Sequence, residues 1–422
     1  MRALPPLHDW LALEHRVAEI LTEQEIHGWY FDESKGQQLE SHLRREMEEV
    51  TEILRGQFPL IGGKMFTPKR NNASQGYIEG SQLQRLIEFN PTSRDHIAWI
   101  LQNRLKITLT QTTTTGKLII DEITLKEIDH PFCKLCARAL DLKKKLGMIS
   151  QGVNAWLKLC TTSSRLHHHC SVSTNTFRCA HRKPNLAQVP ADEKFRQLFR
   201  ASPNKVMVGA DLSGIELRML AHYLGRYDGG RYADILLNDD IHQVNADKIG
   251  ITRRQVKTVT YAFLYGAGNL KLGLSYDNSL TPAKASKKGQ EIRKAYVEAI
   301  DGLADLLAAV NTKAKQGYLT ALDKRKVLID SPHKALNYLL QCGAGVVAKR
   351  WMVIADDACK HHIHTKQLAF VHDELQYETN PDGAKILMSV LEESARLAGE
   401  YYNLRCPIAA EAKQGLTWAD VH

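Results

Sequence analysis

The stretch that decides the fold runs from Lys205 to Leu224 and reads KVMVGADLSGIELRMLAHYL. Its first part, KVMVGA, is short, apolar and partly β-branched, which predicts a buried strand. From Ser213 onward the apolar residues recur at helical spacing, so a helix is expected to begin soon after Asp211. Asp211 therefore lies where a core strand ends, a rigid position that suits a metal ligand. Ser213 and Glu216 are also expected to form an S-x-x-E capping box at the start of this helix. The alternative for Asp211 is that it is a simple helix-flanking acid.

The composition is that of a globular protein. The chain has 422 residues, 43% of them hydrophobic and 24% charged, which suggests two or three subdomains. Lysine and arginine exceed aspartate and glutamate by 56 to 47, and the net charge of +9 fits a polyanionic partner. There is no apolar run that could span a bilayer and no signal-peptide pattern, which argues against a membrane partner. The eight cysteines are therefore expected to be reduced thiols in a cytoplasm.

One cysteine pair, Cys133-x-x-Cys136, has the spacing of a zinc ligand pair. Cys160 and the run His167–Cys170 follow, but no second pair occurs at the spacing of a zinc finger. The two cysteines also fall in PFCKLCARALDLKKKLG, which reads as a helix. Cysteines three residues apart on a helix are more often small core residues than ligands, so the core interpretation is favoured.

Residues 1 to about 165 are expected to be mostly helical. Two amphipathic helices, one ending at Gly28 and the next capped by Asp32, are expected to form an antiparallel pair. From residue 57 to residue 80 the helical pattern fails and an exposed basic loop is predicted, which either contacts phosphate or is simply solvated. The candidate phosphate contacts in this loop are Lys64, Lys69 and Arg70, and a second lysine cluster comprises Lys143, Lys144 and Lys145.

The later part of the chain alternates between β-structure and helix. A β-containing centre is followed by helices from residue 225 to about 330, and strands return after residue 331. Together with the helical N-terminal region, this order predicts an α+β protein with an inserted helical subdomain.

A partner for Asp211 occurs in QLAFVHDELQYET, residues 367–379. Two short strands are predicted here, joined by a tight connection that contains His372, Asp373 and Glu374. Charged side chains at the tip of a buried hairpin are costly unless they are neutralised. A divalent ion shared between Asp211 and Asp373 would neutralise them, and carboxylate oxygens suit Mg²⁺.

The third informative stretch, ITRRQVKTVTYAFLYGAG, covers residues 251–268 and predicts a helix that begins at a Thr252–Gln255 capping box. Four side chains recur on one face of this helix at every fourth position: Arg253, Lys257, Tyr261 and Tyr265. Two cations followed by two aromatic rings fit a nucleoside triphosphate, with phosphates on the cations and the sugar and base on the rings. The alternative is a cationic surface that continues into a buried aromatic end.

These stretches resemble the motifs of a known family, the family A DNA polymerases, and particularly the replicative enzymes of short-tailed bacteriophages. DLSGIELR (211–218), RRQVKTVTYAFLYGAG (253–268) and VHDE (371–374) resemble that family's three polymerase motifs, in the same order. PNLAQVP (184–190) and SPHKALNYLLQ (331–341) resemble two further signatures. A weaker similarity extends through the N-terminal helices, so the resemblance covers essentially the whole chain.

The resemblance implies an α+β right-hand fold with an antiparallel β palm, helical fingers and a helical thumb. The implied domains are a thumb at 1–165, a first part of the palm at 166–224, fingers at 225–330 and a second part of the palm at 331–422. The resemblance also implies that Asp211 and Asp373 bind two catalytic Mg²⁺ ions, for which Mn²⁺ can substitute, and that Glu374 is a supporting acid.

The resemblance further implies roles at the substrate sites. The implied nucleotide-binding residues are Arg253, Lys257, Tyr261, Tyr265, Glu216 and His242. Within this group Lys257 is also expected to protonate the leaving pyrophosphate, Glu216 to block a ribose 2′-hydroxyl, and Tyr261 to sense the sugar 3′-hydroxyl. The implied DNA-binding residues are Arg178, Asn185, Gln188, Asn337, Gln341 and His372. One departure lies beside Arg178, because Phe177 stands where the family commonly has glycine.

The implied activity is DNA-templated addition of dNTPs to a primer 3′-hydroxyl, in phage DNA replication inside a bacterial cytoplasm. No D-x-E motif precedes residue 165, so no intrinsic 3′–5′ exonuclease is expected, and a separate exonuclease or processivity factor is a candidate partner. The segment at 57–80 is shorter than the insertion by which some phage relatives recruit thioredoxin, which argues against that partner. Two rival functions are a single-subunit RNA polymerase, which Glu216 disfavours, and an inactive DNA-binding accessory protein, which the intact acids disfavour.

Overall fold

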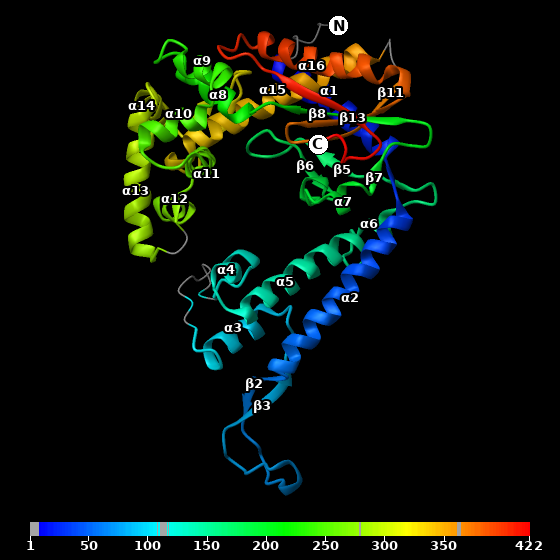
Figure 1. Ribbon diagram of the computed structural model, residues 1–422, viewed down its shortest axis with the longest axis vertical. Coiled ribbons are helices and arrows are strands. Elements are labelled where there is room, and N and C mark those ends of the chain that lie inside the picture. Colours follow the sequence, from blue (N-terminus) through cyan, green and yellow to red (C-terminus); the bar gives the residue numbers. More distant parts are fainter. Residues whose placement is uncertain (1–7, 108, 110–115, 117, 278–279, 361–363) are drawn as a thin grey trace, which may run out of the picture. The chain divides into compact units, whose positions relative to one another are not determined.

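The computed structural model describes residues 8–107, 109, 116, 118–277, 280–360 and 364–422, which form two compact units (Figure 1). The first unit combines the N-terminal residues up to Glu33 with Leu159–His422, and the second is Ser34–Lys158. Part of the expected thumb, the helix α1 (Asp9–His27), thus belongs to the same unit as the central sheet.

The second unit is mainly helical and contains one hairpin. Its helices are α2 (Glu33–Gln57), α3 (Arg94–Asn103), α4 (Glu122–Glu127), α5 (Pro131–Leu146) and α6 (Trp156–Leu159), with short helices η1 (Ala73–Gln75) and η2 (Gly147–Gln151). Its strands are β2 (Leu60–Phe66) and β3 (Leu83–Glu88). Helices α2 and α5 run side by side (Figure 1), and Arg138 of α5 donates to Glu46 of α2 at 2.6 Å. Cys133 and Cys136 are fully buried in α5, as the core interpretation predicts.

Two predictions about this part of the chain are wrong. The stretch from residue 57 to residue 80 is not simply a loop, because residues 60–66 pair with residues 83–88 in an antiparallel hairpin. Its lysines Lys64 and Lys69 are nevertheless exposed, as predicted. Helices α1 and α2 do not form an antiparallel pair, because α1 packs on β11 and α15 in the first unit while α2 belongs to the second. The amphipathic pattern identifies the buried face of a helix but not the partner that covers it.

The first unit is built on a four-stranded antiparallel sheet in the order β11-β12-β8-β13. The strands are β8 (Val206–Leu212), β11 (Thr365–Val371), β12 (Glu374–Thr379) and β13 (Ala410–Gly415). The sheet is covered by α1, α15 (Ala335–Cys359) and α16 (Ala384–Tyr401) (Figure 1). The Trp351 indole N–H donates to the Leu391 carbonyl at 2.8 Å and joins α15 to α16. Burial of a side chain such as Leu391 contributes about 1.5–3 kcal/mol to the stability of the fold, so these helices stabilise the sheet.

The helices expected between residues 225 and 330 form a connected group in the same unit. They are α9 (Arg231–Asn238), α10 (Ile241–Ile249), α11 (Arg253–Leu264), α12 (Asn269–Tyr276), α13 (Pro282–Ala299) and α14 (Leu303–Ala314), and they follow α8 (Ile215–Leu224) along the chain. Helices α12 and α13 meet backbone to backbone at two glycines. A Cβ on Gly273 would lie 1.8 Å from the Ala285 carbonyl oxygen, so only glycine allows this approach.

Short elements complete the first unit. The strands are β1 (Trp29–Phe31), β4 (Arg165–Leu166), β5 (His169–Ser171), β6 (Ala180–Arg182), β7 (Phe199–Arg200), β9 (Tyr318–Thr320) and β10 (Lys326–Leu328). The short helices are α7 (Glu193–Arg196), η3 (Leu186–Gln188), η4 (Pro332–Lys334) and η5 (Pro381–Gly383). No helix in the described residues is long and apolar enough to cross a bilayer.

Helix α8 begins differently from the prediction. Its N-cap is Gly214, in the left-handed conformation with φ of 57°, and no side chain caps the helix. The predicted Ser213–Glu216 capping box is therefore wrong. Glycine adopts this φ without strain and carries the chain from β8 directly into α8. The Glu216 side chain is thereby left available for other contacts.

A buried carboxylate on β12 predicts an acid-sensitive contribution to stability. Burial raises the pKa of Glu378, but hydrogen bonds from His27 and Ser202 outweigh it and lower the pKa from 4.5 to about 2. A lowered folded-state pKa means that the ionised group stabilises the fold above pH 4.5 and loses this effect as the pH falls toward 2. We expect Glu378→Gln to cost about 2 kcal/mol in free energy of unfolding at pH 7 and less at pH 3.

Urea denaturation of both proteins at the two pH values measures this effect. Glu393 on α16 supplies the control. It is exposed and forms a surface ion pair with Arg396, so Glu393→Gln is expected to leave the stability essentially unchanged. An equal loss for Glu378→Gln at pH 7 and pH 3 would show that titration of this carboxyl is not the cause.

Candidate active site

Two adjacent strand ends bring the predicted acids together. Asp211 is the penultimate residue of β8 and lies opposite Glu374, the first residue of β12. The connection between β11 and β12 is a two-residue turn of His372 and Asp373, and the Leu212 N–H donates to the Asp373 carbonyl at 3.0 Å. Glu374 is thus part of the strand and is buried, whereas the prediction placed it in the turn. Asp211 and Asp373 are 162 residues apart in sequence. They come close together because β8 pairs with β12, which directly follows Asp373.

The electrostatics of this site disfavour the ionised acids. Desolvation raises the pKa of Asp373 to about 7, and the charges of Asp211 and Glu216 add to the effect. Desolvation likewise raises the pKa of Asp211 to about 6, with further contributions from Glu374 and Glu216. A bound cation would reverse both shifts, because an opposite charge nearby favours the ionised carboxylate. The donor set and its surroundings therefore fit a divalent metal.

A third member of the cluster, His422, has no motif around it in the sequence. Ligand atoms of Asp211, Glu374 and His422 all lie within 4.8 Å of one another, which makes them the one group of three in the described residues with the spacing of a metal site. The predicted ligand Asp373 is not in this group, and its link to Asp211 is the charge of Asp211 that adds to its raised pKa. His422 Nδ1 lies 3.3 Å from Glu374 Oε2. The other Glu374 oxygen accepts hydrogen bonds from the Trp418 indole and the Gln376 amide. These contacts fix Glu374 inside the sheet, as a supporting acid requires.

Glu216 connects the acid cluster to the helical group. Its Oε1 accepts from Arg178 Nη2 at 2.8 Å and from the Tyr265 hydroxyl at 3.0 Å. Desolvation, together with Glu216, raises the pKa of Tyr265 to about 12, so the phenol remains protonated and can donate. Arg178 also opposes the raised pKa of Asp373, which places its guanidinium near the turn. Arg178 is therefore tied to this site through Glu216.

Helix α11 carries the predicted cationic and aromatic face. The Thr252–Gln255 capping box is confirmed, with both reciprocal hydrogen bonds present. Arg253 Nε donates to Asp240 at 2.6 Å, which joins the start of α11 to the start of α10. Lys257 is exposed, one turn beyond Arg253. Tyr265 is the residue directly after the last helical one and is 48% exposed.

Two further residues extend this face toward α10 and the acids. The His242 ring lies 6.2 Å from the Tyr261 ring, and its buried Nδ1 has no hydrogen-bond partner among the described residues. Desolvation lowers the pKa of His242, so the ring is neutral at physiological pH. The pKa of Tyr261 is raised by desolvation and by the charges of Glu216 and Asp373. Tyr261 is thus electrostatically close to both acids.

The six predicted DNA-binding residues do not form a single group. Besides Arg178, His372 lies beside the acids, and its backbone has a φ of 61°. Burial of the His372 ring and, to a smaller extent, the charge of Arg178 lower its pKa. The Asn337 amide donates to the Leu264 carbonyl at 2.7 Å and so holds the end of α11.

The remaining predicted DNA-binding residues lie on two short segments. The Asn185 side chain caps η3 by accepting from the Ala187 N–H. Gln188 is exposed at the end of η3, and Gln341 is half-buried on α15. No hydrogen bond among the described residues links these three side chains to the acid cluster.

Comparison with known proteins decides which family this site belongs to. The sequence pattern of DNA polymerase family A matches residues 70–420. The chain belongs to DNA polymerase family A. The DNA-directed DNA polymerases of Enterobacteria phage T3 and Escherichia phage T7 are each 30% identical to it, over 97% of this chain and 70% of theirs. A solved polymerase domain of Pol1 from M. smegmatis, in complex with DNA primer-template and dNTP, has a TM-score of 0.78 and 22% identity, over 97% of this chain and 70% of that one.

As a family A member, the chain is a DNA-directed DNA polymerase, and the predicted family resemblance is confirmed. The likeness to the Pol1 domain confirms the α+β right-hand fold. These findings favour the DNA polymerase over the two rival functions. Of the motif residues, Glu374, Asp373 and Glu216 lie near Asp211. The roles of the individual side chains stay predictions.

Proposed function

We propose that this family A polymerase extends a primer 3′-hydroxyl with dNTPs by two-metal-ion phosphoryl transfer, in the replication of phage DNA. The observation that carries the proposal is the pair Asp211 and Asp373, whose raised pKa values fit acids that await a cation. Bound Mg²⁺ would supply activation of the primer hydroxyl and stabilisation of charge on the phosphate. Mn²⁺ accepts the same oxygen ligands and is expected to substitute.

The residues of α11 are proposed to bind the incoming nucleotide. Arg253 and Lys257 contact the triphosphate together with His242, and Lys257 delivers a proton to the leaving pyrophosphate. Tyr261 contacts the sugar near its 3′-hydroxyl, and Tyr265 packs near the templating base. The Arg253 guanidinium pairs with Asp240, and triphosphate binding is proposed to exchange this ion pair for a phosphate contact.

Glu216 is proposed to exclude ribonucleotides. Its carboxylate is fixed from two sides by Arg178 and Tyr265, which leaves it little freedom to move away from a 2′-hydroxyl. A group held in this way discriminates by making the wrong substrate unfavourable rather than by binding the right one more tightly.

The proposed polymeric partner is primer-template DNA. The named complex of the Pol1 domain with DNA and dNTP supports this partner, as does the net charge of +9. Six residues are proposed to contact the duplex: Arg178, Asn185, Gln188, Asn337, Gln341 and His372. The proposed domains keep the ranges 1–165 for the thumb, 166–224 and 331–422 for the palm, and 225–330 for the fingers.

We further propose that this chain does not proofread and that it acts in the cytoplasm of a bacterial host. The proposal rests on the sequence, in which no D-x-E motif precedes residue 165. A separate exonuclease or processivity factor is then a candidate partner, and thioredoxin is not proposed as one. Degradation of a mismatched primer end by the pure chain, retained in Asp373→Asn, would contradict this proposal.

Primer extension on a recessed template tests the proposed function. With Mg²⁺, we expect full extension with dNTPs and very little with rNTPs. Comparable extension with both would contradict the proposed sugar selection and support an RNA polymerase. Retained DNA binding without any extension would support the accessory protein.

The Tyr261 hydroxyl provides a prediction about dideoxynucleotides. A phenol near the sugar can replace the hydrogen bonding of an absent 3′-hydroxyl, so ddNTPs are expected to compete well with dNTPs. Tyr261→Phe is expected to lower ddNTP use by about 10- to 100-fold relative to dNTP use, since one hydrogen bond is lost in a confined site. The chain-termination ratio at a single template position measures the effect, and an unchanged ratio would exclude this role.

A further inference from the structure

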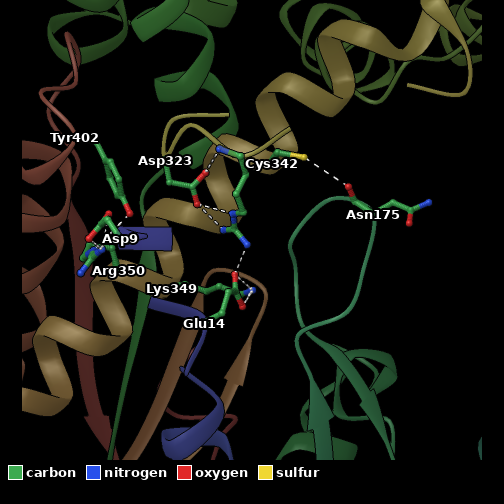
Figure 2. Close-up of polar contacts among 9 residues, drawn as sticks. Asp9, Glu14, Asn175, Asp323, Cys342, Lys349, Arg350 and Tyr402 are labelled. Atoms are coloured by element: carbon green, nitrogen blue, oxygen red, sulfur yellow. Dashed lines mark hydrogen bonds and ion pairs between the residues drawn. The ribbon is translucent and has the colours of Figure 1, made fainter. Parts of the chain in front are cut away.

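A buried group of charges lies close to the active site but contains none of its residues. Arg325, in the connection between β9 and β10, donates to Glu14 at 2.6 Å and to Asp323 at 2.7 Å. Lys349 of α15 donates to the same Glu14 at 2.7 Å (Figure 2) and is completely buried. Two cations and two anions from α1, α15 and the β9–β10 connection thus balance one another. Buried charges of this kind are costly to separate, so each partner holds the others in place.

The Arg325 guanidinium also contacts an aromatic ring on a different segment. Its central carbon lies 4.1 Å from the centre of the Phe177 ring and 5.6 Å from that of Trp10. Phe177 has a φ of 62°, a left-handed conformation that non-glycine residues seldom adopt. Such a conformation costs about 1–3 kcal/mol and persists only where surrounding contacts impose it. The stack on Arg325 is one such contact.

Helix α15 supports the same turn from its other side. The Cys342 thiol donates to the Asn175 carbonyl at 3.7 Å (Figure 2). A Cβ on Gly345 would lie 3.2 Å from the Thr176 carbonyl oxygen, so the turn rests directly on the helix backbone. The turn is closed internally, because the Thr174 hydroxyl donates to the Arg178 carbonyl at 2.6 Å. Residues 174–178 are therefore fixed between α15 and the Arg325 guanidinium.

Arg178 is the next residue after Phe177, and it makes the 2.8 Å ion pair with Glu216. We propose that Arg325 is a positioning residue that holds Phe177, and through it Arg178 and Glu216, so that the buried charge group sets the strictness of sugar selection. This inference rests on the proposed role of Glu216 as the group that excludes a 2′-hydroxyl. Arg325 does not contact the nucleotide in this account. It acts by restricting the movement of Arg178.

The test compares Arg325→Gln with a matched variant at another stacked arginine. Arg350 lies on α15, pairs with Asp9 at 3.1 Å (Figure 2), and stacks on Tyr401 at 4.0 Å. Its contacts run to the N-terminal helix and α16 rather than to the 174–178 turn. We expect Arg325→Gln to raise the ratio of rNTP to dNTP incorporation by roughly 10-fold, and Arg350→Gln to leave it within about 2-fold of wild type.

Two further variants separate positioning from general damage. Phe177→Leu removes the ring but leaves the buried charges intact, and it is expected to raise the same ratio even if Arg325→Gln folds poorly. In the double variant the two effects should not multiply, because both act through one contact. Arg325→Lys keeps the charge but loses the planar stack, so it is expected to restore the thermal stability and not the sugar selection.

The outcomes distinguish this inference from the proposed function. If Glu216→Ala raises rNTP use but neither Arg325→Gln nor Phe177→Leu does, the positioning role is wrong and the sugar gate stands. If Glu216→Ala leaves the ratio unchanged, the sugar gate is wrong and the inference falls with it. A raised ratio in both positioning variants, with Arg350→Gln unaffected, supports the account.

Discussion

Asp373→Asn is expected to slow dNTP incorporation by at least about 10,000-fold, the largest effect that the site predicts. The amide keeps the shape of the side chain but removes the charge that would hold a divalent ion at the β11–β12 turn. Asp211→Asn is expected to act similarly, because the two acids are proposed to share the metals. Single-turnover incorporation on a primer-template, at saturating dNTP and Mg²⁺, measures the loss.

A control acid lies on the same sheet. Glu411 of β13 is opposite Asp211 on the other side of β8 and is exposed, so Glu411→Gln is expected to change the rate only a few-fold. The raised pKa of Asp373 means that burial and the neighbouring acids make its ionised form costly for the fold at neutral pH. Asp373→Asn should therefore melt no lower than wild type and should still bind DNA. A destabilised variant would instead indicate a folding role.

Lys257→Met is expected to lower the maximal incorporation rate by about 100- to 1,000-fold, the range for loss of a proton donor or a charge contact in a transition state. Lys257 is exposed on α11, one turn after Arg253, and is proposed to reach the leaving pyrophosphate. This contact becomes stronger as negative charge develops on the leaving pyrophosphate. The rate at saturating dNTP should therefore fall more than the dNTP affinity. Pre-steady-state measurement over a range of dNTP concentrations separates the two.

The neighbouring arginine provides the control for Lys257. Arg254 is exposed on the same helix but lies outside the face that Arg253 and Lys257 share. Arg254→Met is expected to keep a near-normal rate. If Lys257→Met weakens only dNTP binding, then Lys257 is a ground-state phosphate contact and not a proton donor.

Local signals in the sequence predicted several features well. The strand before Asp211, the capping box of α11 and the buried cysteines of α5 all depend on neighbouring residues, and the structure confirms each. The partnership of Asp211 with the β11–β12 hairpin followed from the cost of unpaired charge at a buried turn. These features are short-range or depend on one energetic rule.

Features that depend on distant contacts were missed or predicted wrongly. The pattern S-x-x-E suggested a cap at Ser213, but Gly214 takes that position and Glu216 pairs with Arg178, 38 residues away in sequence. His422 joins the acids only because the chain returns to them after β13. Arg325 showed no signal at all, since its partners come from three separate elements. Sequence spacing cannot reveal such contacts without the fold.

The count of metal ions in the assembled complex tests the central claim most directly. A complex of the chain with a dideoxy-terminated primer-template and the matching dNTP cannot react, so bound Mn²⁺ can be titrated by electron paramagnetic resonance. We expect two Mn²⁺ ions per wild-type complex, and at least one fewer in Asp211→Asn and in Asp373→Asn, while Glu411→Gln keeps both. Two ions in all four proteins would contradict the assignment of Asp211 and Asp373 as the metal ligands.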